Sequence, residues 1–167
     1  MNDRIAWFDR KFAFGLPSEM LPLLLERLEG TIWRIQHKVE NVDDRVLSTK
    51  FDGKWSAKQN IGHLAEVDQI NNRRIDEILK GVDVFAPAVF EPQDYNPWPM
   101  SKVLTFFREA RESNLKKYAA LSSTEKSMAA VHPRLKVRMT PVDLALFDAE
   151  HDDHHLLKIS DIIRLNR

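Results

Sequence analysis

The chain contains no cysteine among its 167 residues. This absence excludes disulfide bonds, a thiolate zinc site and a cysteine nucleophile. Glycine is also scarce, with 5 residues in total, and long stretches of the chain contain none of the dipeptides that mark tight turns. This composition favours long helices over many short strands.

A net charge and long apolar runs are missing as well. The 25 Lys and Arg residues balance the 25 Asp and Glu residues. Nucleic-acid-binding proteins usually carry an excess of basic residues, so we expect no nucleic-acid partner. No segment approaches the roughly 18 consecutive apolar residues of a membrane span. Charges also interrupt the first segment, "MNDRIAWFDRKFAFGLP", and so rule out the apolar region of a signal peptide. We therefore expect a cytoplasmic protein without a membrane partner.

The residues that are present predict an all-α protein. The hydrophobic fraction of 43% and the charged fraction of 30% are typical of a soluble globular chain. The length suits one domain with a single core, and we predict one helical-bundle domain over residues 1–167. Apolar periodicity predicts four long helices, over residues 18–39, 56–79, 102–121 and 140–164. Four long helices with two substantial connections indicate a four-helix bundle.

Two of these helices have clear start signals. Ser56 and Gln59 form an S-x-x-Q capping box. Thr140 is a good N-cap, followed by Pro141 at the first helical position and by Asp143 at the third. Short helical turns are expected within "NVDDRVLSTKFDGK" and "SSTEKSMAAV".

The histidines are unevenly distributed, and three of the six lie within "AEHDDHHLLKI". On a helix that turns about 100° per residue, His151 and His155 fall within about 20° of the line through Leu144 and Ile162, the centre of the apolar stripe. His154 lies at the edge of that stripe. A solvated helix face therefore does not explain the pair. Buried imidazoles need partners for their nitrogens, and residues one turn apart can bind the same metal ion.

A metal site usually needs a third ligand, and the candidates are His37, His63, His132 and the carboxylates. His63, in "WSAKQNIGHLAEVDQI", lies nearer the rim of its apolar stripe than the centre. Periodicity is therefore compatible with His63 as the third ligand but does not favour it over the other candidates. The protease signature H-E-x-x-H is absent, because Asp152 follows His151 in H-D-D-H-H.

Two stretches together resemble the DinB-like superfamily. "DGKWSAKQNIGHLAEVD" is similar to its W-S-x-x-x-x-x-x-H-L segment on the second helix, and "MTPVDLALFDAEHDDHHLLKI" to its H-x-x-x-H on the last helix. Their order and separation also agree with the family, over about residues 18–164. The resemblance implies a four-helix bundle with a metal site between the second and fourth long helices, formed by His63, His151 and His155.

The resemblance also bears on cofactor and activity. It implies a divalent ion, with zinc or nickel expected first and iron or manganese as alternatives, and it implies a homodimer. Imidazole ligands suit several of these metals, so the ligand set does not select one. Family members of known activity are mainly thiol-dependent transferases and isomerases, and many have no assigned activity.

Polar residues near the predicted ligands are candidates for orienting the imidazoles. They are Gln59, Asp148, Glu150 and Asp152. We expect the three carboxylates to be exposed helix charges, and we assign no general base.

Several aromatic residues also lie near the predicted site. We expect Trp55 to be a packing anchor for the start of its helix. Tyr95 and Trp98 belong to residues 81–100, a segment with four prolines that we predict to be a loop or lid. These two side chains either line the mouth of a metal pocket or form an ordinary hydrophobic clamp.

The remaining histidines are not assigned to the site. His37 lies near the C-terminal end of its predicted helix, where it interacts favourably with the helix dipole. His132 precedes a proline. We expect His154 at the edge of the site or on the surface.

These observations favour a cytoplasmic metal-dependent enzyme that activates a thiol or water toward a small-molecule substrate. The resemblance implies thiol-dependent S-transfer, and a metal-dependent hydrolase is the alternative chemistry. Because the chain has no cysteine, a thiol would have to arrive as a low-molecular-weight cosubstrate. The non-catalytic alternative is a metal- or small-ligand-binding stress protein in which the ion stabilises the fold by binding only the native state. An open site beside a pocket favours the enzyme, and a sealed site favours the structural role.

Overall fold

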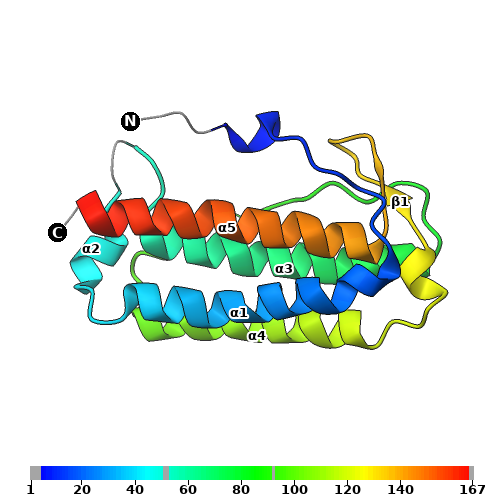
Figure 1. Cartoon of the computed structure of the whole chain (residues 1–167). Helices are drawn as coiled ribbons and strands as arrows, with labels where there is room; N and C mark the ends of the chain where they lie inside the picture. The colour runs from blue at the N-terminus through cyan, green and yellow to red at the C-terminus, as the bar shows by residue number, and fades with distance from the viewer. Residues whose placement is uncertain (1–4, 51–52, 92, 166–167) are drawn as a thin grey trace.

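The computed structural model describes residues 5–50, 53–91 and 93–165. Its elements are helices α1 (Leu21–Val39), α2 (Asp44–Ser48), α3 (Ala57–Leu79), α4 (Met100–Ala119) and α5 (Pro141–Leu165), a hairpin of strands β1 (Ala130–Val131) and β2 (Arg138–Met139), and three 3-10 turns, Trp7–Asp9, Ser18–Met20 and Glu125–Ser127. The four long helices pack as a bundle (Figure 1), which confirms the predicted fold class. None of the helices in the described ranges has the length and apolar character of a membrane span.

The predicted caps start α3 and α5. Ser56 Oγ accepts a hydrogen bond from Gln59 N at 3.1 Å, and Gln59 Oε1 accepts one from Ser56 N at 3.0 Å. At α5, Thr140 Oγ1 accepts from Asp143 N at 3.2 Å, and Asp143 Oδ2 accepts from Thr140 N at 3.0 Å. Each pair therefore satisfies backbone N–H groups that lack a partner within the helix. Helix α4 begins at Met100, two residues before the predicted start.

The order of the helices around the bundle differs from a simple up-and-down arrangement. Helix α1 packs against α4 and α5, and α3 packs against the same two helices, so α1 and α3 lie at opposite corners. The neighbours α3 and α4 run in the same direction (Figure 1). Their connection must therefore return along the length of α3, about 35 Å for 23 residues at 1.5 Å each. The proline-rich segment 81–99 makes this crossover and lies against one face of the bundle.

A buried polar layer divides the core into two apolar clusters. At its centre is Arg111, whose side chain is 2% exposed. Its guanidinium donates to Asp68 at 2.9 Å and to Asp152 at 2.6 and 2.9 Å, and it also donates to the carbonyl of Leu28 at 2.9 Å. Asn114 adds a hydrogen bond to Asp68 at 3.0 Å. Because these residues come from all four long helices, the layer fixes how the helices are aligned.

Candidate metal centre

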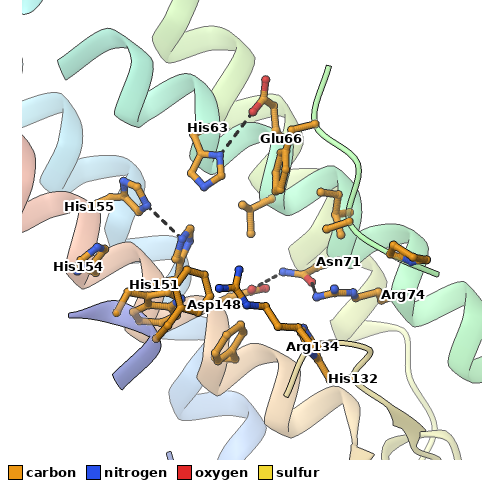
Figure 2. A pocket seen from close by; sticks show the side chains of 18 of the residues that line it. His63, Glu66, Asn71, Arg74, His132, Arg134, Asp148, His151, His154 and His155 are labelled. Atoms are coloured by element: carbon orange, nitrogen blue, oxygen red, sulfur yellow. Dashed lines mark hydrogen bonds and ion pairs between the residues drawn. The ribbon is translucent and has the colours of Figure 1, made fainter. Parts of the chain in front are cut away.

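Three histidines from two helices come together on one wall of the bundle. His63 lies on α3, and His151 and His155 lie on α5 (Figure 2). Each offers a ring nitrogen, and these nitrogens all lie within 4.8 Å of one another. The Nε2 atoms of His151 and His155 are 3.1 Å apart. The structure thus brings together the three residues that the sequence singled out.

Asn60 fixes the orientation of the His155 ring. Asn60 Oδ1 lies 2.7 Å from His155 Nδ1, and Asn60 Nδ2 donates to the Ser56 carbonyl at 2.7 Å. Because the amide nitrogen is committed to a carbonyl, the oxygen must face the imidazole and accept from it. His155 therefore carries its proton on Nδ1 and presents the Nε2 lone pair to the other histidines.

His63 is oriented by a second polar chain. Its Nδ1 lies 3.6 Å from Glu66 Oε2, and Tyr95 donates its hydroxyl to Glu66 Oε1 at 2.7 Å. Burial, followed by this hydrogen bond, raises the pKa of the Tyr95 hydroxyl. The tyrosine ring lies flat on the helix at Gly62, where an added Cβ would come within 2.3 Å of ring carbon Cδ2. Glycine at this position is therefore what allows Tyr95 to reach Glu66.

The N-terminal segment covers His151. The Trp7 ring lies 5.0 Å from the His151 ring, centroid to centroid. The segment is held by Gly15 N and Leu16 N, which donate to Asp143 Oδ1 at 2.7 and 3.2 Å. Within the described structure His151 Nδ1 is buried and has no hydrogen-bond partner. The histidine pair is therefore incompletely satisfied by the protein alone.

The chemistry of the cluster fits a divalent metal ion. Burial lowers the pKa of His151 and of His155 well below 6.5, and the neighbouring histidines lower it further. Both imidazoles are therefore neutral at pH 7, the form that binds metals. Two nitrogens bound to one ion at about 2.1 Å lie at most about 4.2 Å apart, so a small side-chain rotation would close the observed group.

The cluster opens into a cavity of about 940 Å³. Helices α3 and α5 form its floor. Three irregular segments form its rim, and they contribute Trp7 and Phe8, residues 87, 88, 90, 91, 93 and 95, and residues 132–135. This volume is at the upper end of the range for small-molecule pockets. The predicted loop 81–100 thus supplies a wall of the cavity.

Two of the predicted surface charges are buried, so the expectation for Asp148 and Asp152 was wrong. Asp152 pairs with Arg111 in the polar layer, and Asp148 accepts a hydrogen bond from Asn71. Their partners lie on other helices, which the pattern of a single helix does not reveal. Glu150 is half-buried and binds Arg27 at 2.8 Å.

The polar neighbours of the ligands are not the ones considered from sequence. Gln59 serves the helix cap and has no hydrogen bond to an imidazole in the described structure. Asn60 forms the hydrogen bond to His155, and Glu66 lies 3.6 Å from His63 Nδ1. A signal existed for Asn60, since it is a polar residue one turn from Leu64 on the buried stripe of its helix.

The aromatic residues divide between the cavity and the core. Trp55 is 46% exposed and lies 4.8 Å from the His63 ring, so it flanks the histidines instead of anchoring the helix start as expected. Tyr95 lines the cavity and also packs 5.3 Å from Trp98 and 5.9 Å from Phe106. Tyr95 therefore both lines the cavity and forms part of a hydrophobic cluster with Trp98, so both interpretations of this residue hold.

The other histidines take different places. His37 is on the surface beside Glu40. His154 lines the cavity next to Trp7, and its pKa falls to about 4 through burial and the nearby Lys158. His132 also lines the cavity, although the sequence did not place it there.

The fold and the histidine cluster together define a class of helical-bundle proteins with a candidate metal site in a cavity between two helices. The model of the DinB superfamily matches residues 27–159, and the chain belongs to this superfamily. This confirms the family resemblance seen in the sequence.

One similar solved structure is YfiT from Bacillus subtilis, described as "a probable metal-dependent hydrolase with an unusual four-helix bundle topology". It matches with a TM-score of 0.78 and 22% sequence identity, over 93% of this chain and 92% of that chain. At this identity the likeness shows the fold. No curated protein matches the chain.

Proposed function

We propose that the protein is a metal-dependent enzyme that acts on a small molecule, with His63, His151 and His155 as the ligands of a divalent ion. The observation that carries this proposal is the convergence of three ring nitrogens within 4.8 Å at the wall of a cavity of about 940 Å³. Within the described residues the group has no fourth histidine or carboxylate. Structural zinc sites are usually closed by four protein ligands, whereas catalytic sites keep a position open.

A divalent ion held there would supply Lewis acidity, which lowers the pKa of bound water or of a thiol and polarises a carbonyl. The residues of the chain prepare the site for it. Asn60 holds the lone pair of His155 toward the other ligands, and Glu66 holds His63. Trp7 and Trp55 cover the cluster from two sides and limit the access of bulk water. Zinc and nickel are the ions we expect.

Two nucleophiles are compatible with this arrangement. The description of YfiT as a probable metal-dependent hydrolase supports water. The engagement of Glu66, the described carboxylate beside His63, supports a thiol, which ionises more readily than water. Glu66 is engaged by Tyr95 and His63, and the low pKa of His154 makes it a weak base. Hydrolysis and thiol transfer are therefore assayed in parallel, with an activated ester in the presence and absence of a small thiol.

The direct test is the metal content of untagged protein. We expect one zinc or nickel ion per chain in the wild type and none in His151→Ala. His37→Ala is the matched control, because this histidine is also helical but lies on the surface. If the wild type takes up neither ion, or if His151→Ala binds as well as His37→Ala does, the proposed ligand set is wrong.

The same samples test the non-catalytic alternative. If the ion only stabilises the fold, its removal lowers the melting temperature but the bound ion has no exchangeable coordination position. We expect a small hydroxamate to bind the metal-loaded protein, and the expected homodimer is tested by sedimentation of that sample.

A further inference from the structure

The cavity extends well beyond the histidines, to a second polar end. Arg74 lies on α3 eleven residues after His63, so the two side chains differ by about 20° around the helix and by about 16 Å along it. Both line the same cavity. Figure 2 shows the histidines at one end and Arg74, Arg134 and His132 at the other. Nothing in the proposed metal chemistry uses this second end.

Arg74 is buried without a charged partner. It is 5% exposed, its Nε has no hydrogen-bond partner, and its one hydrogen bond among the described residues is a long one of 3.4 Å to Asn71. The guanidinium of Arg111, by contrast, is fully engaged by two carboxylates. A buried guanidinium without such partners is costly. An anion that binds in the cavity would therefore supply the missing charged partner of the Arg74 guanidinium.

Two acidic residues, Glu77 and Asp148, lie near Arg74. Glu77 pairs with Arg73 at 3.4 Å and accepts a hydrogen bond from the backbone N of Ala86 at 3.1 Å. Asp148 Oδ1 accepts from Asn71, and the buried Asp148 Oδ2 has no hydrogen-bond partner among the described residues. Burial raises the pKa of Asp148 well above its usual value, which favours the neutral carboxyl. Neither residue forms an ion pair with Arg74 in the described part of the chain.

The loop after β1 adds further donors. His132 Nδ1 accepts from the backbone N of Arg134 and of Leu135, at 3.3 and 3.1 Å. The neutral ring must therefore carry its proton on Nε2, which makes that atom a donor. The Arg134 guanidinium stands over the Phe8 ring, 3.4 Å from its centroid. This end of the cavity thus contains the Arg74 guanidinium and an imidazole N–H.

We infer that Arg74, with His132, binds a carboxylate or phosphate group of the substrate, while the opposite end of the same molecule lies at the histidines. The second half of this inference rests on the proposed function, and the first half does not. Between the two ends the wall includes the apolar side chains of Val67, Ile70 and Phe147, beside Asn71 and Asp148. The substrate class is therefore an elongated small-molecule anion with an apolar middle and a metal-binding or electrophilic group at its far end.

The test uses a matched pair of probes. Suberic acid monohydroxamate carries a hydroxamate for the metal and a carboxylate for Arg74, and its methyl ester lacks only the charge. On zinc-loaded wild-type protein we expect calorimetry to give a Kd at least about tenfold lower for the acid, the factor expected for hydrogen bonds to a charged group. A phosphonate in place of the carboxylate shows which anion is preferred.

Variants assign this preference to one residue. Arg74→Met should remove the preference and leave the Kd of the ester unchanged. Arg73→Gln is the matched control, because Arg73 is the adjacent residue on the exposed side of α3, and it should keep the preference. Arg74→Lys retains a charge and is used if the methionine variant is not folded by circular dichroism.

The outcomes separate the two proposals. Equal Kd values for acid and ester on wild-type protein would overturn the anion subsite, even if both bind only when zinc is present. If zinc has no effect on either probe, the metal centre fails. Suberate binding to metal-free wild type that is lost in the Arg74 variant would still support the subsite, and no suberate binding there would overturn it.

Discussion

The hydrogen bond between Asn60 and His155 offers a sharp test of the metal centre. Asn60→Ala removes the acceptor that holds the His155 ring, at 2.7 Å between Oδ1 and Nδ1. Both residues are buried, so water cannot readily take the place of the amide. Losing a partner of this kind typically weakens metal binding by about 10- to 100-fold. This corresponds to about 1.4 to 2.7 kcal/mol of binding free energy.

The assay is competition for zinc against a chromophoric chelator, repeated with nickel. Asn60→Asp keeps an oxygen facing the ring and should retain most of the affinity, which separates the lost hydrogen bond from altered packing. Asn72→Ala is the control on the same helix, since Asn72 donates to Ser113 at 3.2 Å away from the site. If Asn60→Ala is folded and binds zinc within about twofold of the wild type, the hydrogen bond from His155 to Asn60 does not orient the ring for metal binding, and this reasoning is refuted.

Three further predictions concern stability. Gly62→Ala places a Cβ 2.3 Å from the Tyr95 ring and should cost about 1–3 kcal/mol in urea unfolding, whereas Gly30→Ala, in an open helical position, should stabilise by about 0.5–1 kcal/mol; similar values for both would contradict the contact. Arg111→Met leaves two buried carboxylates without their cation and should cost about 3–5 kcal/mol, and a loss under 1 kcal/mol would argue against the buried network. The lowered pKa of His151 means that the unfolded chain binds a proton below pH 6.5 and the folded chain does not. As the pH falls below 6.5, the free energy of unfolding of metal-free protein should therefore decrease by about 1.4 kcal/mol per pH unit because of this histidine. If the free energy of unfolding of His151→Gln has the same pH dependence as that of the wild type, the burial of His151 is contradicted.

Local patterns were enough to predict the helices and the placement of His151 and His155 side by side on the buried face of α5. Capping residues such as Ser56 and Thr140 accept hydrogen bonds from backbone N–H groups in the first turn of their own helix. A few neighbouring residues are therefore enough to predict where each of these helices starts. The placement of His151 and His155 on the buried face also follows from the periodicity of one helix. His63 needed the family resemblance, because its place near the rim of its stripe does not distinguish a ligand from a surface histidine.

What the sequence did not reveal depends on contacts between distant segments. In the sequence, Asp148 and Asp152 look like surface charges. In the structure they are buried because other helices bring Asn71 and Arg111 next to them. Arg74 likewise looks like an ordinary basic residue, and its burial depends on the packing around it. The cavity forms because the connection between α3 and α4 crosses the bundle and the N-terminal segment folds back over α5. The path of neither segment can be predicted from its own residues.

The crossover topology has a consequence for how this protein can change. Helices joined through Arg111 hold the histidines, whereas three irregular segments, before α1, between α3 and α4 and after β1, contribute the rim of the cavity. Loops tolerate substitution and length change better than the elements they join. The shape and chemistry of the cavity can therefore change through these three segments while the geometry of the histidine cluster stays fixed. An engineer would randomise the rim and leave α3 and α5 untouched.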